Sequence, residues 1–130
     1  KGIFARAKIE LGHTGMNKTE ARYFNEILYP RFKAGEILRA YFDRVRRKLS
    51  AGSEICWLKP DFEVLTADGF IEYHEIKGAY ITEDAGVKFK CAMEQYPEFG
   101  WLMWQWKDNK WQLIKDSRKI ERVMLSCNFP

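Results

Sequence analysis

The sequence contains few of the residues that build zinc, disulfide and histidine-based sites. His13 and His74 are the two histidines, so a metal centre made of several imidazole ligands is disfavoured. Cys56, Cys91 and Cys127 are widely spaced and form no CxxC pair, which argues against a zinc site and a disulfide framework. We interpret them as buried thiols in a reducing compartment. No local signature supports Ser-His-Asp or Cys-His catalysis.

Long apolar runs are also missing. No stretch approaches the roughly 18 to 20 apolar residues that a membrane-spanning helix requires. Residues 1–6 lack the continuous apolar segment of a secretory signal. We therefore expect no membrane association and a cytoplasmic location. The chain has 130 residues, of which 46% are hydrophobic and 31% are charged, and this composition predicts one folded domain over residues 1–130.

Positive charge is concentrated in one stretch of the chain. The net charge is +4, whereas residues 31–49 hold seven basic residues against Glu36 and Asp43, which gives +5 for this stretch alone. Such a concentration predicts contact with a polyanion such as nucleic acid, and a solvated face of one element is the alternative. The basic residues are Arg31, Lys33, Arg39, Arg44, Arg46, Arg47 and Lys48.

Local signals mark the first helix and the segment after it. Asn17 and Glu20 have the spacing of a capping box, and apolar residues follow at helical intervals. Pro30 should end this helix near Tyr29, with a ragged continuation to Lys33 as the alternative. Residues 36–49 fit either a helix or a long strand, and we favour the strand because a turn signal and another strand-like run follow at once.

The rest of the chain alternates strands, one helix and tight turns. Asp68-Gly69 is a strong hairpin signal, and Asp108-Asn109 marks a further turn. Strands are expected over residues 54–58, 62–65, 70–76, 101–106 and 111–114, a helix over residues 83–96, and a short element of open type over residues 118–125. This order predicts an α/β (α+β) fold with a central mixed sheet flanked by helices.

Asp61, Glu75 and Lys77 are the residues with the clearest chemical potential. Glu75 and Lys77 lie two residues apart on one expected strand, so their side chains share a face. Asp61 stands just before the other arm of the hairpin, and pairing of the arms would bring it opposite Glu75. We therefore expect the two carboxylates and the lysine to converge. A surface ion pair is the plainer alternative.

Two carboxylates and a lysine suit the hydrolysis of phosphodiesters. Carboxylate and carbonyl oxygens hold Mg²⁺ or Mn²⁺ and leave coordination positions for water and phosphate. We expect Asp61 and Glu75 to be ligands, with the main-chain carbonyl of Ile76 as an additional one. Lys77 would orient the attacking water or offset negative charge in the transition state.

Pro60-Asp61 followed by Glu75-Ile76-Lys77 resembles the motif of the PD-(D/E)xK nuclease superfamily. The resemblance implies a restriction-endonuclease-like core and DNA cleavage that depends on a divalent metal. Lys77-Gly78, followed by a lysine-bearing helix that ends at Tyr96-Pro97, is similar to small phage-encoded endonucleases, including the junction resolvases of the phage endonuclease I type. The resemblance covers residues 17–106 and leaves both ends of the chain unexplained.

The resemblance also implies roles for residues outside the motif. In many members of the superfamily an acidic residue of the first helix joins the metal site, and Glu20 stands in that position here. The alternative is a glutamate that only caps the helix at Asn17. Lys88 and Lys90 lie where related nucleases carry lysine or glutamine beside the scissile phosphate, and exposed lysines on an amphipathic helix are the alternative.

Neighbouring residues receive plainer interpretations. His74 faces away from Glu75 and is expected to be packed or partly exposed rather than a catalytic base, and Glu72 on the same face should be solvated. Glu63 is either an auxiliary ligand or a surface charge. Tryptophans are expected to pack across the last hairpin, with base stacking as the alternative. They are Trp101, Trp104, Trp106 and Trp111.

We therefore expect a DNA endonuclease that depends on Mg²⁺ or Mn²⁺ and selects branched or junction DNA rather than a base sequence. The expected catalytic residues are Glu20, Asp61, Glu75 and Lys77, the metal ligands are Asp61, Glu75, Ile76 and Glu20, and the DNA contacts are Lys88, Lys90, Arg39, Arg44, Arg46, Arg47 and Lys48. Paired cuts at a junction require two sites, so a homodimer is expected for that activity, although the sequence carries no signal for one. If the chain is phage-encoded, the location would be the cytoplasm of a bacterial host.

Two other hypotheses remain open at this point. One is a catalytically silent module of nuclease fold that binds DNA or serves as a subunit of a complex. The other is an unrelated small α+β interaction protein in which the motif arises by chance.

Overall fold

The computed structural model describes residues 15–51 and 53–118, with the main chain alone described at Ala51. The short element expected over residues 118–125 lies outside these ranges apart from its first residue. The elements are α3 (Lys18–Tyr23), η1 (Phe24–Leu28), α4 (Tyr29–Lys33), β1 (Ile37–Phe42), β2 (Arg47–Ala51), β3 (Glu54–Leu58), β4 (Phe62–Thr66), β5 (Ile71–Lys77), α5 (Glu83–Gln95), β6 (Gly100–Lys107) and β7 (Lys110–Asp116).

The segments α3, η1 and α4 form one continuous helix. The predicted capping box at its start is confirmed, because Asn17 and Glu20 exchange hydrogen bonds between side chain and main chain. The predicted end near Tyr29 is wrong, and the alternative, a continuation to Lys33, is correct. Residues 24–28 form a wider π-helical turn, so Pro30 falls in the first turn of α4, where a missing N–H is tolerated.

The central sheet has five strands in the order β1-β4-β5-β6-β7. β1, β4 and β5 are antiparallel neighbours, β6 lies parallel to β5 after a crossover through α5, and β7 returns antiparallel to β6. Gly69 has φ 92°, and Asp108 and Asn109 have φ 54° and 57°, angles that these residue types tolerate in tight turns. The predicted mixed sheet flanked by helices is confirmed, as are both turns.

The strand expected over residues 36–49 is two strands that belong to different sheets. β1 joins the central sheet, whereas β2 pairs with β3 in a separate two-stranded sheet. The break falls at Asp43, where φ is 58° and the chain leaves the central sheet. Sequence periodicity cannot show this break, because apolar residues at Phe42, Val45 and Leu49 continue the pattern on both sides of Asp43.

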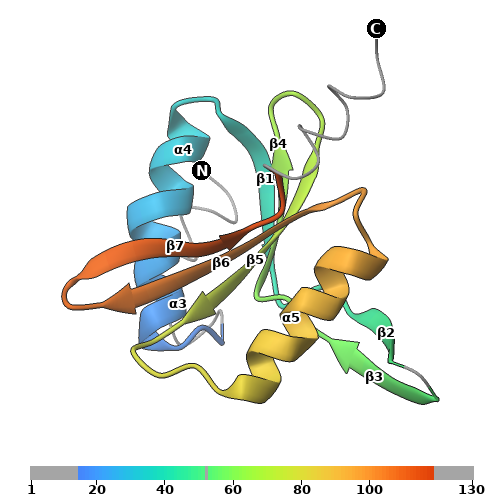
Figure 1. Cartoon of the computed structure of the whole chain (residues 1–130). Helices are drawn as coiled ribbons and strands as arrows, with labels where there is room; N and C mark the ends of the chain where they lie inside the picture. Colours follow the sequence, from blue (N-terminus) through green and yellow to red (C-terminus); the bar gives the residue numbers. More distant parts are fainter. Residues whose placement is uncertain (1–14, 52, 119–130) are drawn as a thin grey trace, which may run out of the picture.

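Apolar side chains fill the space on both faces of the central sheet. The first helix covers one face, where Tyr23, Leu28 and Phe62 are buried. α5 and the β2–β3 hairpin cover the other face, where Phe89 and Trp101 are buried. Figure 1 shows α4 behind the sheet and α5 in front of it. Within the described ranges, no helix has the length and apolar character needed to cross a membrane.

Candidate active site

The β4–β5 hairpin places Asp61 beside Glu75. Pairing of the two arms begins with Phe62 opposite His74, so Asp61 and Glu75 are the next residues at the open end. Oδ2 of Asp61 accepts a hydrogen bond of 2.7 Å from the N–H of Ile76. That N–H belongs to the peptide bond that follows Glu75. The Asp61 carboxylate therefore accepts from the Ile76 N–H just beyond the last residue pair of β4 and β5.

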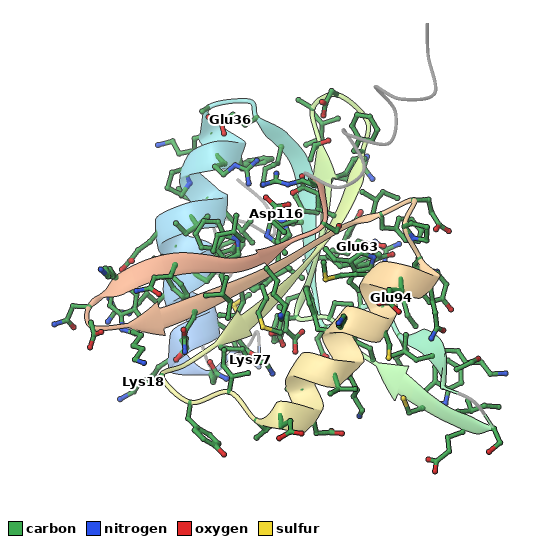
Figure 2. All side chains as sticks on the ribbon, in the orientation of Figure 1. Lys18, Glu36, Glu63, Lys77, Glu94 and Asp116 are labelled. Atoms are coloured by element: carbon green, nitrogen blue, oxygen red, sulfur yellow. The ribbon has the colours of Figure 1, made fainter. Side chains whose placement is uncertain are left out.

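Glu75 and Lys77 share a face of β5, as predicted. Lys77 Nζ lies 3.1 Å from Glu75 Oε2, and the Glu75 side chain is only 10% exposed. The second oxygen, Oε1, is buried and has no hydrogen-bond partner among residues 15–51 and 53–118. A buried carboxylate oxygen without a donor is costly, so a cation or another donor fits at this atom. Figure 2 shows Lys77 where β5 ends and the chain leaves the sheet toward α5.

Glu20 both caps its helix and reaches the acidic pair. Its Oε1 accepts a hydrogen bond of 2.9 Å from the N–H of Asn17, while Asn17 Oδ1 accepts one of 2.8 Å from the N–H of Glu20. Its carboxylate also acts on Asp61 through charge and a side-chain hydrogen bond, and on Glu75 through charge. Glu20 therefore caps the helix, but capping is not its whole role, because the helix start lies against the acidic pair. A role for Glu20 as a metal ligand stays a prediction.

Both carboxyl groups of the pair hold their protons more tightly than usual. At Asp61 the pKa rises from 3.8 to about 8, mainly because the group is buried. The negative charges of Glu75 and Glu20 raise it further, and the hydrogen bond from the Ile76 N–H lowers it by less. Burial also raises the pKa of Glu75, although the Lys77 ammonium acts in the opposite direction. One lysine thus fails to balance the negative charge gathered at this point.

His74 belongs to a buried chain of hydrogen bonds on the opposite face of β5. The His74 ring bonds to the Tyr23 hydroxyl through Nδ1 and lies 2.9 Å from Glu72 Oε1 through Nε2, while Arg118 Nη1 lies 3.1 Å from Glu72 Oε2. Burial lowers the pKa of His74, and its neutral ring donates Nε2–H to Glu72 and accepts from Tyr23.

The predicted packing of His74 is confirmed, but the predicted solvation of Glu72 is wrong. Glu72 is buried, and Arg118 and His74 lower its pKa in spite of burial. The alternation of faces along β5 was predicted correctly, but both faces of this central strand are covered. The hydrogen bond between Tyr23 and His74 also fixes the first helix to the strand that carries Glu75.

Arg47, one of the expected DNA contacts, is directed into the protein. Its guanidinium donates to the Tyr73 hydroxyl and lies 4.5 Å from the ring centroid of Phe99 and 5.5 Å from that of Tyr96. The Tyr73 hydroxyl in turn donates to Glu63 Oε2 at 2.9 Å. Glu63 and Arg47 are therefore joined through Tyr73. This half-buried cluster explains both side chains as structural groups.

The other expected DNA contacts of residues 39–48 are exposed, and the three arginines among them lie beside aromatic rings. Arg39 Nη1 is 3.3 Å from the Tyr41 hydroxyl, and the Arg44 guanidinium lies 3.8 Å from the Tyr41 ring centroid. Arg46 lies 4.9 Å from the ring centroid of Trp57. Lys48 is also exposed.

Tyr41 and Trp57 were not among the DNA contacts predicted from the sequence. A signal for Trp57 was available, since residues 55–58 are apolar on both faces of a strand that can bury only one.

Lys88 and Lys90 lie on different faces of α5. Lys88 is half-buried and Lys90 is exposed, while Phe89 between them is buried in the core. Residues two apart in a helix are separated by about 200°, so the two lysines cannot face the same group. At most one of them can lie beside a phosphate held at Asp61 and Glu75.

The aromatic packing expected in the last hairpin is confirmed. Trp106 and Trp111 are paired across β6 and β7 with ring centroids 5.1 Å apart, and Trp101 is fully buried on the other face.

Cys56 and Cys91 are partly buried free thiols, which agrees with their predicted state in part, and Cys127 lies outside the described residues.

The acidic pair fits a divalent cation, although it does not form a complete protein cage. In the described part of the chain, no group of three or more His, Cys, Asp or Glu side chains is arranged to hold a metal ion. Mg²⁺ is commonly held by one or two carboxylates, with waters and substrate phosphates as the other ligands. Raised carboxyl pKa values and the unpartnered Glu75 Oε1 are features that such a cation would relieve.

Comparisons with known proteins add little to this geometry. No family model matches the sequence, and no curated protein matches it. Among solved structures, the chain entitled "Crystal structure of SSO0001" shares 11% identity with this one, with a TM-score of 0.42. The similarity covers 93% of this chain and 67% of that chain. At this level it carries no argument about activity.

Proposed function

We propose that this protein is a divalent-metal-dependent DNA endonuclease of the PD-(D/E)xK type. The observation that carries the proposal is the pair formed by Asp61 and Glu75, two buried carboxyl groups with raised pKa values beside Lys77. Raised carboxyl pKa values in a cluster with a lysine are typical of functional sites. The mixed sheet with a helix on each face supports the restriction-endonuclease-like core that the motif implies.

The chain's own groups divide into those that hold a cation and those that act on the substrate. Asp61 and Glu75 would hold Mg²⁺ or Mn²⁺, with the carbonyl of Ile76 and the carboxylate of Glu20 as the further expected ligands. The Ile76 N–H fixes Asp61 in place. When bound, the ion would polarise the phosphodiester and lower the pKa of water, so that hydroxide is available as the nucleophile.

Lys77 is the group that would act on the reacting phosphate. In the absence of substrate its ammonium is paired with Glu75 Oε2. With the charge of Glu75 neutralised, the Lys77 ammonium would be available to donate hydrogen bonds to water or to a phosphate oxygen. A fixed positive charge at this position stabilises the negative charge that develops in the transition state.

The exposed basic residues supply affinity for the DNA backbone. Arg39, Arg44, Arg46 and Lys48 would contact phosphates without regard to sequence, so binding should weaken steeply as salt rises. Since little in the sequence suggests base readout, we propose selectivity for branched or flapped DNA. The proposal places the protein in the cytoplasm, of a bacterial host if the chain is phage-encoded, and as a homodimer if it makes paired cuts at a junction.

Cleavage assays test the proposal directly. Plasmid, linear and four-way-junction DNA are incubated with the protein in Mg²⁺, in Mn²⁺ and in EDTA, and the products are separated on gels. We expect metal-dependent cleavage that falls by at least about a hundredfold in Glu75→Ala and Lys77→Ala. Glu63→Gln is the matched control, because Glu63 shares the face of Asp61 but bonds to Tyr73, and its cleavage rate should stay near that of the wild type.

Binding without cleavage in either metal would instead support the catalytically silent module. The absence of a three-carboxylate cluster among the described residues is the observation that favours this second candidate. If the protein is a nuclease in which Lys77 acts only on the reacting phosphate, Lys77→Ala should lower cleavage and leave DNA affinity nearly unchanged.

A further inference from the structure

The β2–β3 hairpin is an arm attached to the side of the central sheet (Figure 1). Its inner face is fixed, because Leu49 and Leu58 are buried in the core beneath α5. The end of α5 also holds the main chain of β2. The Tyr96 hydroxyl donates to the carbonyl of Lys48 at 2.6 Å, and Ser50 donates its N–H to the side chain of Gln95 at 2.9 Å.

The outer face of the hairpin presents an apolar surface with a large ring. Lys48 lies opposite Trp57, and Ser50 lies opposite Ile55. Trp57 is 48% exposed and Ile55 is 60% exposed, although both are large apolar side chains. The Arg46 guanidinium lies 4.9 Å from the centroid of the Trp57 ring. An exposed indole with a cation at its side is a surface on which a base can stack.

Charge around this face favours a polyanion over a protein partner. Residues 43–59 hold five basic residues against Asp43 and Glu54, which gives +3 of the chain's net +4. Asp43 is already paired with Lys59 at 2.9 Å. A nucleic-acid strand matches both features of the surface, since it offers phosphates to the cations and flat bases to the ring.

The hairpin is also physically joined to the candidate active site. β3 runs into Asp61 only four residues after Trp57, a span of at most about 14 Å of extended chain. The N–H of Asp43 donates to the carbonyl of Asp61 at 2.9 Å, which ties the root of the hairpin to the acidic pair. A nucleotide on Trp57 would therefore lie within a few nucleotides of a phosphate at Asp61 and Glu75.

We propose that the outer face of the β2–β3 hairpin binds an unpaired stretch of DNA, with a base stacked on Trp57 and neighbouring phosphates on Arg46 and Lys48. The bases of an intact duplex are stacked on one another, so a ring at this position selects a strand that is single, flapped or frayed. This inference rests on the proposed function for its substrate, and it names the feature of branched DNA that the protein recognises.

Fluorescence anisotropy in EDTA tests the stacking without any need for cleavage. The probes are a labelled oligothymidylate of about 20 nucleotides and a blunt duplex of the same length. We expect Trp57→Leu to weaken binding of the single strand about tenfold and binding of the duplex less than about twofold. Trp57→Phe should restore most of the lost affinity, because it retains an aromatic face. Phe70→Leu is the matched control, since it removes an exposed ring outside the hairpin and should leave the affinity for both probes unchanged.

The possible results separate this inference from the proposed function. Equal losses on both probes, no loss at all, or no binding of the single strand by the wild type would each overturn the stacking role. A change in sedimentation of the DNA-free protein on Trp57→Leu, without a change in DNA affinity, would show a protein contact and also overturn it. If the selective loss occurs while the wild type cleaves no DNA in Mg²⁺ or Mn²⁺, the hairpin inference stands and the nuclease proposal fails.

Discussion

Replacing Asp61 with asparagine should make the metal-free protein more stable at neutral and alkaline pH. The asparagine side chain resembles the protonated form of Asp61, and its carbonyl can still accept the hydrogen bond from Ile76. In the wild type, the pKa of Asp61 rises from 3.8 to about 8 on folding. As pH rises through this interval, the unfolded chain loses a proton that the folded chain keeps, so the wild type loses stability.

The size of the effect follows from the shift in pKa. Each unit corresponds to about 1.4 kcal/mol, so the advantage of the variant should grow by about 1.4 kcal/mol per pH unit and reach about 4 kcal/mol between pH 5 and pH 8. This is a large part of the 5–15 kcal/mol stability typical of a domain, so about 4 kcal/mol is easily measured. Burial lowers the pKa of His74, which changes stability in the opposite direction below pH 6.5, but this change is common to both proteins and cancels in their difference.

Urea unfolding in EDTA, followed by far-ultraviolet circular dichroism at several pH values, measures this difference. Glu63→Gln serves as the control and should show the pH dependence of the wild type. Mg²⁺ at pH 8 should then stabilise the wild type but not the asparagine variant, because only the charged pair binds the ion. A difference that stays constant from pH 5 to pH 8 would refute the account of a proton trapped at Asp61.

Four further substitutions test other parts of the structure. Tyr23→Phe removes the hydrogen bond to His74 and should lower the free energy of unfolding by about 1–3 kcal/mol in urea unfolding, because the ring nitrogen loses its buried partner. Arg47→Ala should lower the melting temperature with little effect on the salt dependence of DNA binding, because Arg47 is bonded to Tyr73 inside the protein. Arg44→Ala should leave stability unchanged and reduce the slope of log affinity against log salt by about 1. Gly69→Ala should cost about 1–2 kcal/mol in thermal unfolding, because φ is 92° there.

Features that depend on a few neighbouring residues were predictable from the sequence. The capping box at Asn17 and Glu20, the turn at Asp68-Gly69 and the shared face of Glu75 and Lys77 each follow from local geometry. The placing of Asp61 beside Glu75 also followed, because a tight turn fixes which residues of a hairpin are opposite each other. Such features need no knowledge of the rest of the fold.

Features that depend on distant packing were not predictable in the same way. The helix does not end near Pro30, because a π-helical turn precedes the proline and the helix packs on the sheet on both sides of it. Arg47 belongs to a basic run, yet rings from β5 and from the end of α5 draw it inward. Glu72 was expected in solvent, because nothing in the local pattern shows that Arg118 lies against it. Each case requires a contact between segments far apart in the sequence.

Glu72 and Glu75 on the same strand provide the strongest internal argument for a cation at the acidic pair. Both are buried, but His74 and Arg118 donate hydrogen bonds to Glu72 and Arg118 adds positive charge, and these contacts lower its pKa. On the other face, Lys77 pairs with Glu75, yet the pKa values of both Asp61 and Glu75 are raised. A fold able to neutralise a buried glutamate at one position leaves two carboxyl groups short of positive charge a few residues away. The missing charge is what a divalent ion would supply, and this is why the pair, rather than Glu72, is the place to look for catalysis.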